Sequence, residues 1–147
     1  KSAPIMAWNG QAPGIKAARL GNPVIMTPKW YCYFDYSQTS DPARYEPLSN
    51  IRYLSVRQVY RLDPLDQLAQ PHWQQILGVQ CNLWTEYIGD IGHAQHMVLP
   101  RMAALSEVGW ANDRKEYNDF VRRLHSLRRI YEAEGYRYAP YLFEGIE

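Results

Sequence analysis

The sequence lacks several features that would assign it to a particular class of protein. No run of about 18 apolar residues occurs in the 147-residue chain, so no transmembrane helix is predicted. Sixteen Lys and Arg residues against fifteen Asp and Glu residues give a formal net charge of +1, without long blocks of either sign. Composition therefore gives no electrostatic reason to expect binding to nucleic acid or to an anionic membrane.

Cysteine and histidine are also scarce. Cys32 and Cys81 each lie inside an apolar or aromatic run, not in the spacing of a metal or redox motif, and we expect buried free thiols. A disulfide between them would require Cα atoms within about 7 Å, a distance that stays open at this point. The four histidines do not form a spaced ligand set, so neither a metal nor another cofactor is predicted.

Polar aromatic residues are abundant, with twelve Tyr and five Trp against three Phe. Tyr and Trp combine a flat apolar face with a polar edge, a mixture that suits a carbohydrate site. The same residues also fill protein cores and their rims, so composition alone leaves both interpretations open.

Short runs that are apolar throughout alternate with helical patterns along the chain. Three such runs predict buried strands: 5–8, 24–27 and 76–84. Three patterns predict helices: 15–20 before Gly21, 93–110 with Pro100 as a kink or start, and 115–134 before Gly135. Residues 29–63 predict a long loop with one helical piece at 55–60, and loops of this length are commonly functional.

Apolar strands that alternate with helices favour parallel strands covered on both faces, which is the α/β class. Three strands with long outgoing loops resemble consecutive βα units of a TIM barrel, whose functional residues collect at the carboxyl ends of the strands. A whole barrel takes about 250 residues, and this chain has room for about three or four units. We expect a partial TIM barrel, with an open sheet of another fold as the alternative.

A polar and aromatic cluster follows each predicted strand: Trp8-Asn9, then Tyr33-Phe34-Asp35-Tyr36, then Trp84-Thr85-Glu86. An aromatic ring packs on the apolar face of a pyranose, while a neighbouring carboxylate accepts hydrogen bonds from sugar hydroxyls. Tyr33 and Asp35 would share a face if their segment is extended. Each cluster suits a sugar site, and the alternative is a surface carboxylate beside a core aromatic ring.

The order of the motifs carries a family resemblance. The segments AARLGNPVIMTPKWYCYFDYSQ, ILGVQCNLWTEYI and MVLPRMAALSEVGW, with Val59-Tyr60 and Asp63-Pro64 between the first two, resemble the second half of the catalytic domain of glycoside hydrolase family 20. WTE alone is a weak signal, whereas LWTE followed by LPRMAALSEVGW is specific. The resemblance implies that residues 1–147 are the C-terminal portion of one catalytic (β/α)8 barrel, without a second domain.

Members of this family are retaining, exo-acting β-N-acetylhexosaminidases that remove terminal β-linked N-acetylglucosamine or N-acetylgalactosamine from glycans and glycoconjugates. Their nucleophile is the substrate's own acetamido oxygen. The resemblance implies that Tyr33 is catalytic and stabilises the oxazolinium intermediate. It also implies that Trp8 and Trp84 form walls of the acetamido pocket. Asp35 and Glu86 are expected to bind outer hydroxyls of the sugar, with Glu86 binding the hydroxyl at C4.

The family's general acid is the Glu of an adjacent Asp-Glu pair, and no such pair occurs in this sequence. Glu107 and Arg101 lie in a segment that resembles a structural helix, where we expect Arg101 to be an ion-pair partner. The isolated chain is therefore expected to be inactive. The alternatives are a non-catalytic carbohydrate-binding protein derived from the same barrel, and an α/β interaction domain whose aromatic residues only pack.

Two positions depart from the family pattern. Asn9 follows Trp8 where an acidic residue is common, and Gln95-His96 replaces a common Glu-Tyr pair. Exposed barrel edges would favour self-association. From the resemblance we expect an exported protein. The first residues, KSAPIMAW, have no signal-peptide pattern, so the cellular compartment stays open.

Overall fold

The computed structural model describes residues 3–146 and contains a three-stranded parallel sheet. Its strands, in spatial order, are β1 (Ile5–Ala7), β2 (Val24–Met26) and β5 (Ile76–Val79). The register aligns Ile5 with Val24 and Val24 with Ile76. Because the strands are parallel, their carboxyl ends meet at one edge of the sheet. The α/β class is thereby confirmed.

The connection from β1 to β2 is the helix α1 (Gln11–Arg19), which starts four residues before the predicted helix. Pro13 lies in its first turn, where a missing backbone N–H is tolerated. The end of α1 is as predicted, with Gly21 in the left-handed region at φ 79°. Gly14 permits close packing on the sheet, because a Cβ there would lie 2.8 Å from the Cβ of Ala7.

The segment between β2 and β5 is more ordered than the predicted long loop. It contains α2 (Lys29–Cys32), β3 (Tyr36–Ser37), α3 (Pro42–Tyr45), β4 (Asn50–Tyr53), α4 (Val56–Tyr60) and the 3₁₀ helix η1 (Gln70–Gln75). The predicted helix at 55–60 is confirmed, and the Ser55 hydroxyl caps it by accepting from the Gln58 N–H. Strands β3 and β4 form a second, parallel pair that the sequence did not predict.

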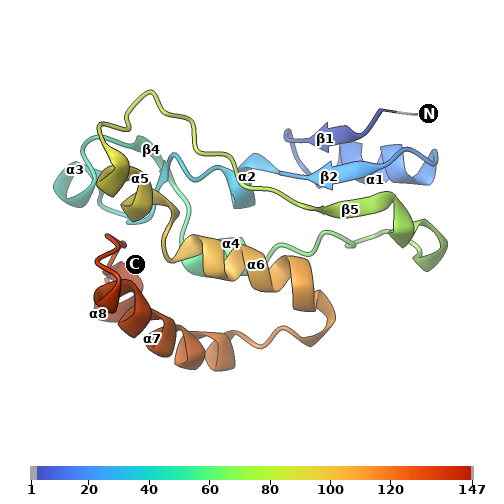
Figure 1. Ribbon diagram of the computed structural model, residues 1–147. Coiled ribbons are helices and arrows are strands. Elements are labelled where there is room, and N and C mark those ends of the chain that lie inside the picture. Colours follow the sequence, from blue (N-terminus) through green and yellow to red (C-terminus); the bar gives the residue numbers. More distant parts are fainter. Residues whose placement is uncertain (1–2, 147) are drawn as a thin grey trace.

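The C-terminal part is helical, but the predicted helix 93–110 is two helices, α5 (Ile91–Val98) and α6 (Arg101–Ala111). Pro100 disfavours helical conformation at Leu99, which is extended at φ −97° and ψ 136°. The 3₁₀ helix η2 (Asn112–Arg114) and α7 (Tyr117–Ala133) follow, and α7 confirms the third predicted helix. The short α8 (Tyr141–Glu144) was not predicted. In Figure 1, α6 runs alongside β5 and α7 lies farther out.

The third predicted strand, 76–84, was too long. Strand β5 ends at Val79, and beyond it Asn82 forms only an isolated parallel bridge with Tyr33. The residues after Asn82 leave the sheet as a loop that ends where α5 begins (Figure 1). The polar residues at the end of ILGVQCNLWTE are thereby placed at the sheet edge, and not inside the sheet.

Arg101 is buried, with 0% of its surface exposed, and its guanidinium carbon lies 4.7 Å from the ring centroid of the core residue Phe34. Its guanidinium donates hydrogen bonds to main-chain oxygens of four residues: Phe34 (2.6 Å), Tyr36 (2.8 Å), Leu54 (3.1 Å) and Met97. The sequence predicted an ion pair for Arg101, whereas these bonds go to carbonyl groups. A single side chain thus joins the segment of β3, the end of β4 and α5.

Both cysteines are free, as predicted, but only Cys32 is buried and Cys81 is half-buried. Burial raises the pKa of both thiols, so both remain protonated at neutral pH. Among the residues that the structure describes, no helix has the length and apolarity needed to cross a bilayer.

Candidate functional site

A pocket of about 330 Å³ lies where the segments after β2 and β5 meet. It brings together four of the five side chains predicted for a sugar site: Tyr33, Asp35, Trp84 and Glu86. Three further residues line it: Tyr36, Asn50 and Tyr87. The pocket therefore combines four aromatic side chains, two carboxylates and one amide.

Main-chain hydrogen bonds hold the two sides of this pocket together. The Phe34 N–H donates to the Asn82 carbonyl at 2.7 Å, and the Asn82 N–H donates to the Cys32 carbonyl at 2.8 Å. The Asn82 side chain also donates to the Thr27 hydroxyl at 2.7 Å. These bonds place Trp84, two residues after Asn82, beside Tyr33.

Tyr33 and Trp84 form the aromatic part of the pocket. Their ring centroids are 6.0 Å apart in an edge-to-face arrangement. Burial raises the pKa of Tyr33 above its ordinary value, so the phenol keeps its proton and can donate a hydrogen bond. Trp84 is 49% exposed, so about half of its surface is accessible to a ligand.

Asp35 is a buried carboxylate with unused hydrogen-bonding capacity. Only 7% of its surface is exposed, and its Oδ1 has no hydrogen-bond partner among residues 3–146. Burial raises its pKa, while Asn50 and Arg101 oppose the increase and the Glu86 carboxylate adds to it. Buried acceptors in native proteins are nearly always paired, so Oδ1 is ready to accept a hydrogen bond from a ligand.

Trp8 lies apart from the other four predicted residues and does not line the pocket. It is 52% exposed at the end of β1, and Lys29 Nζ is 5.5 Å from its ring centroid and 5.6 Å from that of Trp30. Lys29 also donates to the Asn9 side chain at 2.9 Å. This group reaches the pocket through Trp30, whose ring lies 6.0 Å from that of Tyr36, and through the Lys29 carbonyl, which accepts from the Tyr33 N–H at 3.3 Å.

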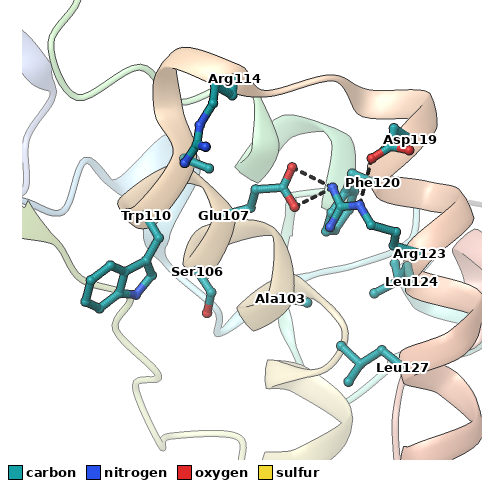
Figure 2. Close-up of a pocket in the computed structure, with 11 residues that line it drawn as sticks. Ala103, Ser106, Glu107, Trp110, Arg114, Asp119, Phe120, Arg123, Leu124 and Leu127 are labelled. Atoms are coloured by element: carbon teal, nitrogen blue, oxygen red, sulfur yellow. Dashed lines mark hydrogen bonds and ion pairs between the residues drawn. The ribbon is translucent and has the colours of Figure 1, made fainter.

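A larger hollow, of about 680 Å³, lies between α6 and α7 (Figure 2). Its charged groups bind one another: Arg123 contacts both oxygens of Glu107 at 2.7 and 2.8 Å, and its Nε donates to Asp119 at 2.7 Å. The Tyr60 hydroxyl also donates to Glu107 at 2.7 Å. Glu107 therefore binds side chains of neighbouring helices, and it does not line the pocket that contains Tyr33 and Trp84.

No three His, Cys, Asp or Glu side chains within residues 3–146 are arranged to hold a metal ion. His96, which replaces a Tyr of the family pattern, instead contacts Glu46 through Nε2 at 2.7 Å. The pocket thus offers hydrogen-bonding groups and aromatic faces, a combination that suits an uncharged polyhydroxylated ligand.

Residues 1–113 match the profile of the catalytic domain of glycosyl hydrolase family 20. The chain belongs to this family of glycoside hydrolases. The family assignment that the motifs from AARLGNP to LPRMAALSEVGW indicated is therefore confirmed.

Relatives of the family cover most of the chain. A beta-hexosaminidase of Porphyromonas gingivalis is 35% identical over 140 residues, which are 93% of this chain and 18% of that protein. A beta-N-acetylhexosaminidase of Cellulomonas fimi is 29% identical over 130 residues, covering 86% of this chain and 25% of that protein. A mutant Streptomyces plicatus beta-hexosaminidase in complex with the product GlcNAc superposes with a TM-score of 0.80 and 27% identity.

The Streptomyces plicatus match covers 94% of this chain and 29% of that chain. The family 20 chain described here thus spans between 18% and 29% of the length of these three relatives.

Sequence reasoning missed Asn50, and it assigned no role to Tyr36 or Tyr87, although both lie next to predicted residues. Tyr36 ends the YFDY cluster and Tyr87 follows Glu86, so adjacency is a signal that could have found them. Asn50 reaches the pocket through the pairing of β3 with β4. Strands of two and four residues are too short to show a periodicity, so no local signal marks it.

We predict that Asp35→Asn makes the folded protein more stable at neutral pH. Folding raises the pKa of Asp35 above its value in the unfolded chain. The stability that the protonated Asp35 contributes is therefore fully present below the unfolded-state pKa of this carboxyl, and it is lost as the pH rises through its folded-state pKa. Asparagine does not ionise and avoids this loss. Thermal unfolding of the full-length protein between pH 4 and pH 8 should show an advantage for the variant that grows with pH, about as the linkage relation requires.

The matched control for this prediction is Asp113→Asn, because the Asp113 side chain is 84% exposed. This control should unfold at the same temperature as the parent protein throughout the pH range. An Asp35→Asn variant that is less stable than the parent at pH 8 would contradict the argument from burial.

Proposed function

We propose that the chain is the C-terminal part of the catalytic (β/α)8 barrel of a retaining β-N-acetylhexosaminidase, to which it contributes about the last three or four βα units. Membership of family 20 and the three parallel strands, whose spatial order follows their order along the chain, support this assignment. Residues 1–147 form one portion of a single domain. β1 and β5 are the outer strands of the sheet within the described residues, and we include self-association through these edges in the proposal.

The substrate that we propose is a glycan or glycoconjugate with a terminal β-linked N-acetylglucosamine or N-acetylgalactosamine. The observation that carries the proposal is the pocket in which the Tyr33 phenol, the Trp84 indole and the unpaired Oδ1 of Asp35 converge. The complex of the Streptomyces plicatus relative with GlcNAc supports the choice of sugar. Aromatic faces and carboxylates are the groups that grip one pyranose.

Tyr33 acts on the reaction itself. The acetamido oxygen of the substrate attacks its own anomeric carbon while the bond to the aglycone oxygen breaks, and an oxazolinium ion forms. The Tyr33 hydroxyl donates a hydrogen bond to that acetamido oxygen and holds it near the anomeric carbon. Burial keeps the phenol protonated, as this role requires. Positioning of this kind makes an intramolecular attack fast.

The other residues bind the sugar. Trp84 walls the acetamido group, Asp35 accepts from an outer hydroxyl through Oδ1, and Glu86 accepts from the hydroxyl at C4. The proposed role of Trp8 as a second wall rests on the family resemblance alone, because Trp8 is not a lining residue of the pocket. The proposed reaction involves no metal and no cofactor.

Proton transfer to the leaving aglycone requires the family's Asp-Glu pair, which this sequence does not contain. We therefore propose that the 147-residue chain alone does not hydrolyse glycosides, while the full-length protein does. The prediction is tested with a chromogenic β-N-acetylglucosaminide, and NMR of the first product should show retention of the β configuration. Cleavage by the isolated chain, or an inverted product from the full-length protein, would contradict it.

A binding measurement made beside this assay separates the alternatives. Binding of the thiazoline analogue of N-acetylglucosamine to the full-length protein, without turnover, would identify a carbohydrate-binding protein derived from the barrel. Absence of both binding and turnover would identify an interaction domain whose aromatic residues only pack.

A further inference from the structure

Three side chains, those of Asp35, Asn50 and Arg52, form a chain that leads from the pocket to the surface. Strand β4 begins at Asn50, which is aligned with Tyr36 in the parallel pairing with β3. The Asn50 N–H donates to the Asp35 main-chain oxygen at 3.0 Å. The backbone therefore fixes Asn50 beside Asp35 before any side-chain contact is considered.

Arg52 determines which end of the Asn50 amide faces Asp35. The Asn50 Oδ1 accepts from the Arg52 main-chain N–H at 3.2 Å and from Arg52 Nη1 at 3.2 Å. The amide NH₂ is thereby left to face Asp35, and it donates to Oδ2 at 3.4 Å. A flipped amide would lose both Arg52 donors and would set its carbonyl oxygen against the carboxylate.

The contact with Asn50 leaves the two oxygens of Asp35 with different tasks. Oδ2 faces the amide, while Oδ1 is buried without a partner among residues 3–146. A carboxylate that rotates freely would present either oxygen, and the amide restricts that rotation.

Arg52 is itself held at the rim of the pocket. Its guanidinium carbon lies 5.8 Å from the ring centroid of Tyr36, which is another lining residue. Its side chain is exposed, so the arginine has no core position that would explain its orientation. The contacts with Asn50 and Tyr36 are those that place it.

We propose that Asn50 and Arg52 are positioning residues of the sugar site: Arg52 fixes the Asn50 amide, and the amide orients the Asp35 carboxylate so that Oδ1 accepts from a hydroxyl of the terminal sugar. This inference rests on the proposed function, since it requires that Asp35 bind the substrate. Asn50 does not touch the reacting atoms. Arg52 touches neither the reacting atoms nor the substrate.

The charged and titratable groups around Asp35 come from several elements. They are Arg101 of α6, Glu86 of the segment after β5, Arg52 of β4, and the phenols of Tyr33 and Tyr36. The hydrogen bond from Asn50 lowers the pKa of Asp35, against the larger effect of burial. Loss of the amide donor should therefore move the ionisation of Asp35 to higher pH, whereas a purely structural change would not.

The experiment measures kcat and KM of the full-length protein for a chromogenic β-N-acetylglucosaminide across pH 4 to 8. Asn50→Ala should lower kcat/KM about tenfold, as expected for one hydrogen bond to a charged group, and should shift the acid limb of kcat/KM to higher pH. Asn50→Asp should have the larger effect, because it sets a second carboxylate against Asp35. Ile51→Ala is the matched control, since Ile51 is 81% exposed between the two residues.

Variants of Arg52 test the second step. Arg52→Ala should have a smaller effect than Asn50→Ala, because the main-chain N–H at position 52 still donates to Oδ1 of Asn50. Arg52→Lys, which retains a cationic donor, should restore part of the loss. These two variants keep the proposal testable if Asn50→Asp does not fold.

Asp35→Asn separates failure of this inference from failure of the proposed function. If Asp35→Asn retains the parent kcat and KM, then Asp35 does not bind the substrate and the proposed site is wrong. If Asp35→Asn is impaired but Asn50→Ala keeps both the kcat/KM and the acid limb of the parent, the positioning role alone is overturned. Equal losses at every pH, without a shift of the limb, would also overturn it.

Discussion

Replacing Tyr33 with Phe in the full-length protein should lower kcat for a chromogenic β-N-acetylglucosaminide by about 10²–10³-fold, a loss of the size measured when one preorganised hydrogen-bond donor is removed from an active site. The substitution deletes only the hydroxyl, and the ring can keep its edge-to-face contact with Trp84. The effect should fall on kcat and less on KM, because the hydroxyl holds the acetamido oxygen in position for attack on the anomeric carbon, and this positioning is realised in the transition state.

Tyr31→Phe is the matched control for this prediction. Tyr31 lies two residues before Tyr33, packs against the apolar core and does not line the pocket. Its loss of a hydroxyl should leave kcat within about twofold of the parent, as expected for a side chain without a role in the transition state. An unchanged kcat in Tyr33→Phe would remove Tyr33 from the proposed mechanism.

The sequence predicted those parts of the site that depend on strands with a clear pattern. The apolar runs that became β2 and β5 are bounded by Gly, Pro or polar residues, and parallel pairing brings their ends together. The clusters that contain Tyr33 and Trp84 therefore had to meet at one edge of the sheet. Placement next to a strand end, more than residue type, made this part of the site predictable.

The parts that could not be predicted depend on contacts between segments distant in sequence. Asn50 enters the pocket through pairing with Tyr36, and neither strand is long enough to have a pattern of its own. Trp8 follows the first strand as predicted, yet Lys29 packs on its ring and the pocket forms without it. Trp8 and Trp84 both follow a strand in the sequence, and they differ in whether the folded chain places them at the pocket. No local sequence pattern encodes that difference.

Arg101 links the stability of the core to the geometry of the site. The carbonyl groups of Phe34 and Tyr36, which flank Asp35 in sequence, both accept hydrogen bonds from its guanidinium, at 2.6 and 2.8 Å. These bonds fix the backbone on either side of Asp35. The planar guanidinium offers five donors, so it can satisfy several carbonyl groups from one buried position.

Arg101→Met should therefore be the most destabilising substitution in the chain that we predict here. Methionine fills much of the volume but leaves buried carbonyl groups without their donor, and each such group costs about 1–3 kcal/mol, so we expect a loss on the order of 3–5 kcal/mol. Thermal and urea unfolding of the full-length protein will measure this loss, and hydrolytic activity should fall with it because the backbone around Asp35 is released.

Two variants make this result specific. Arg101→Lys retains a buried cation with three donors but not the planar fork, so its loss of stability should lie between those of the parent and the methionine variant. Arg61→Met removes an exposed arginine and should change the unfolding free energy by less than about 0.5 kcal/mol. An Arg101→Met protein that unfolds at the parent temperature would show that the carbonyl groups of Phe34, Tyr36 and Leu54 find other donors, and that Asp35 is held in place by the β3–β4 pairing alone.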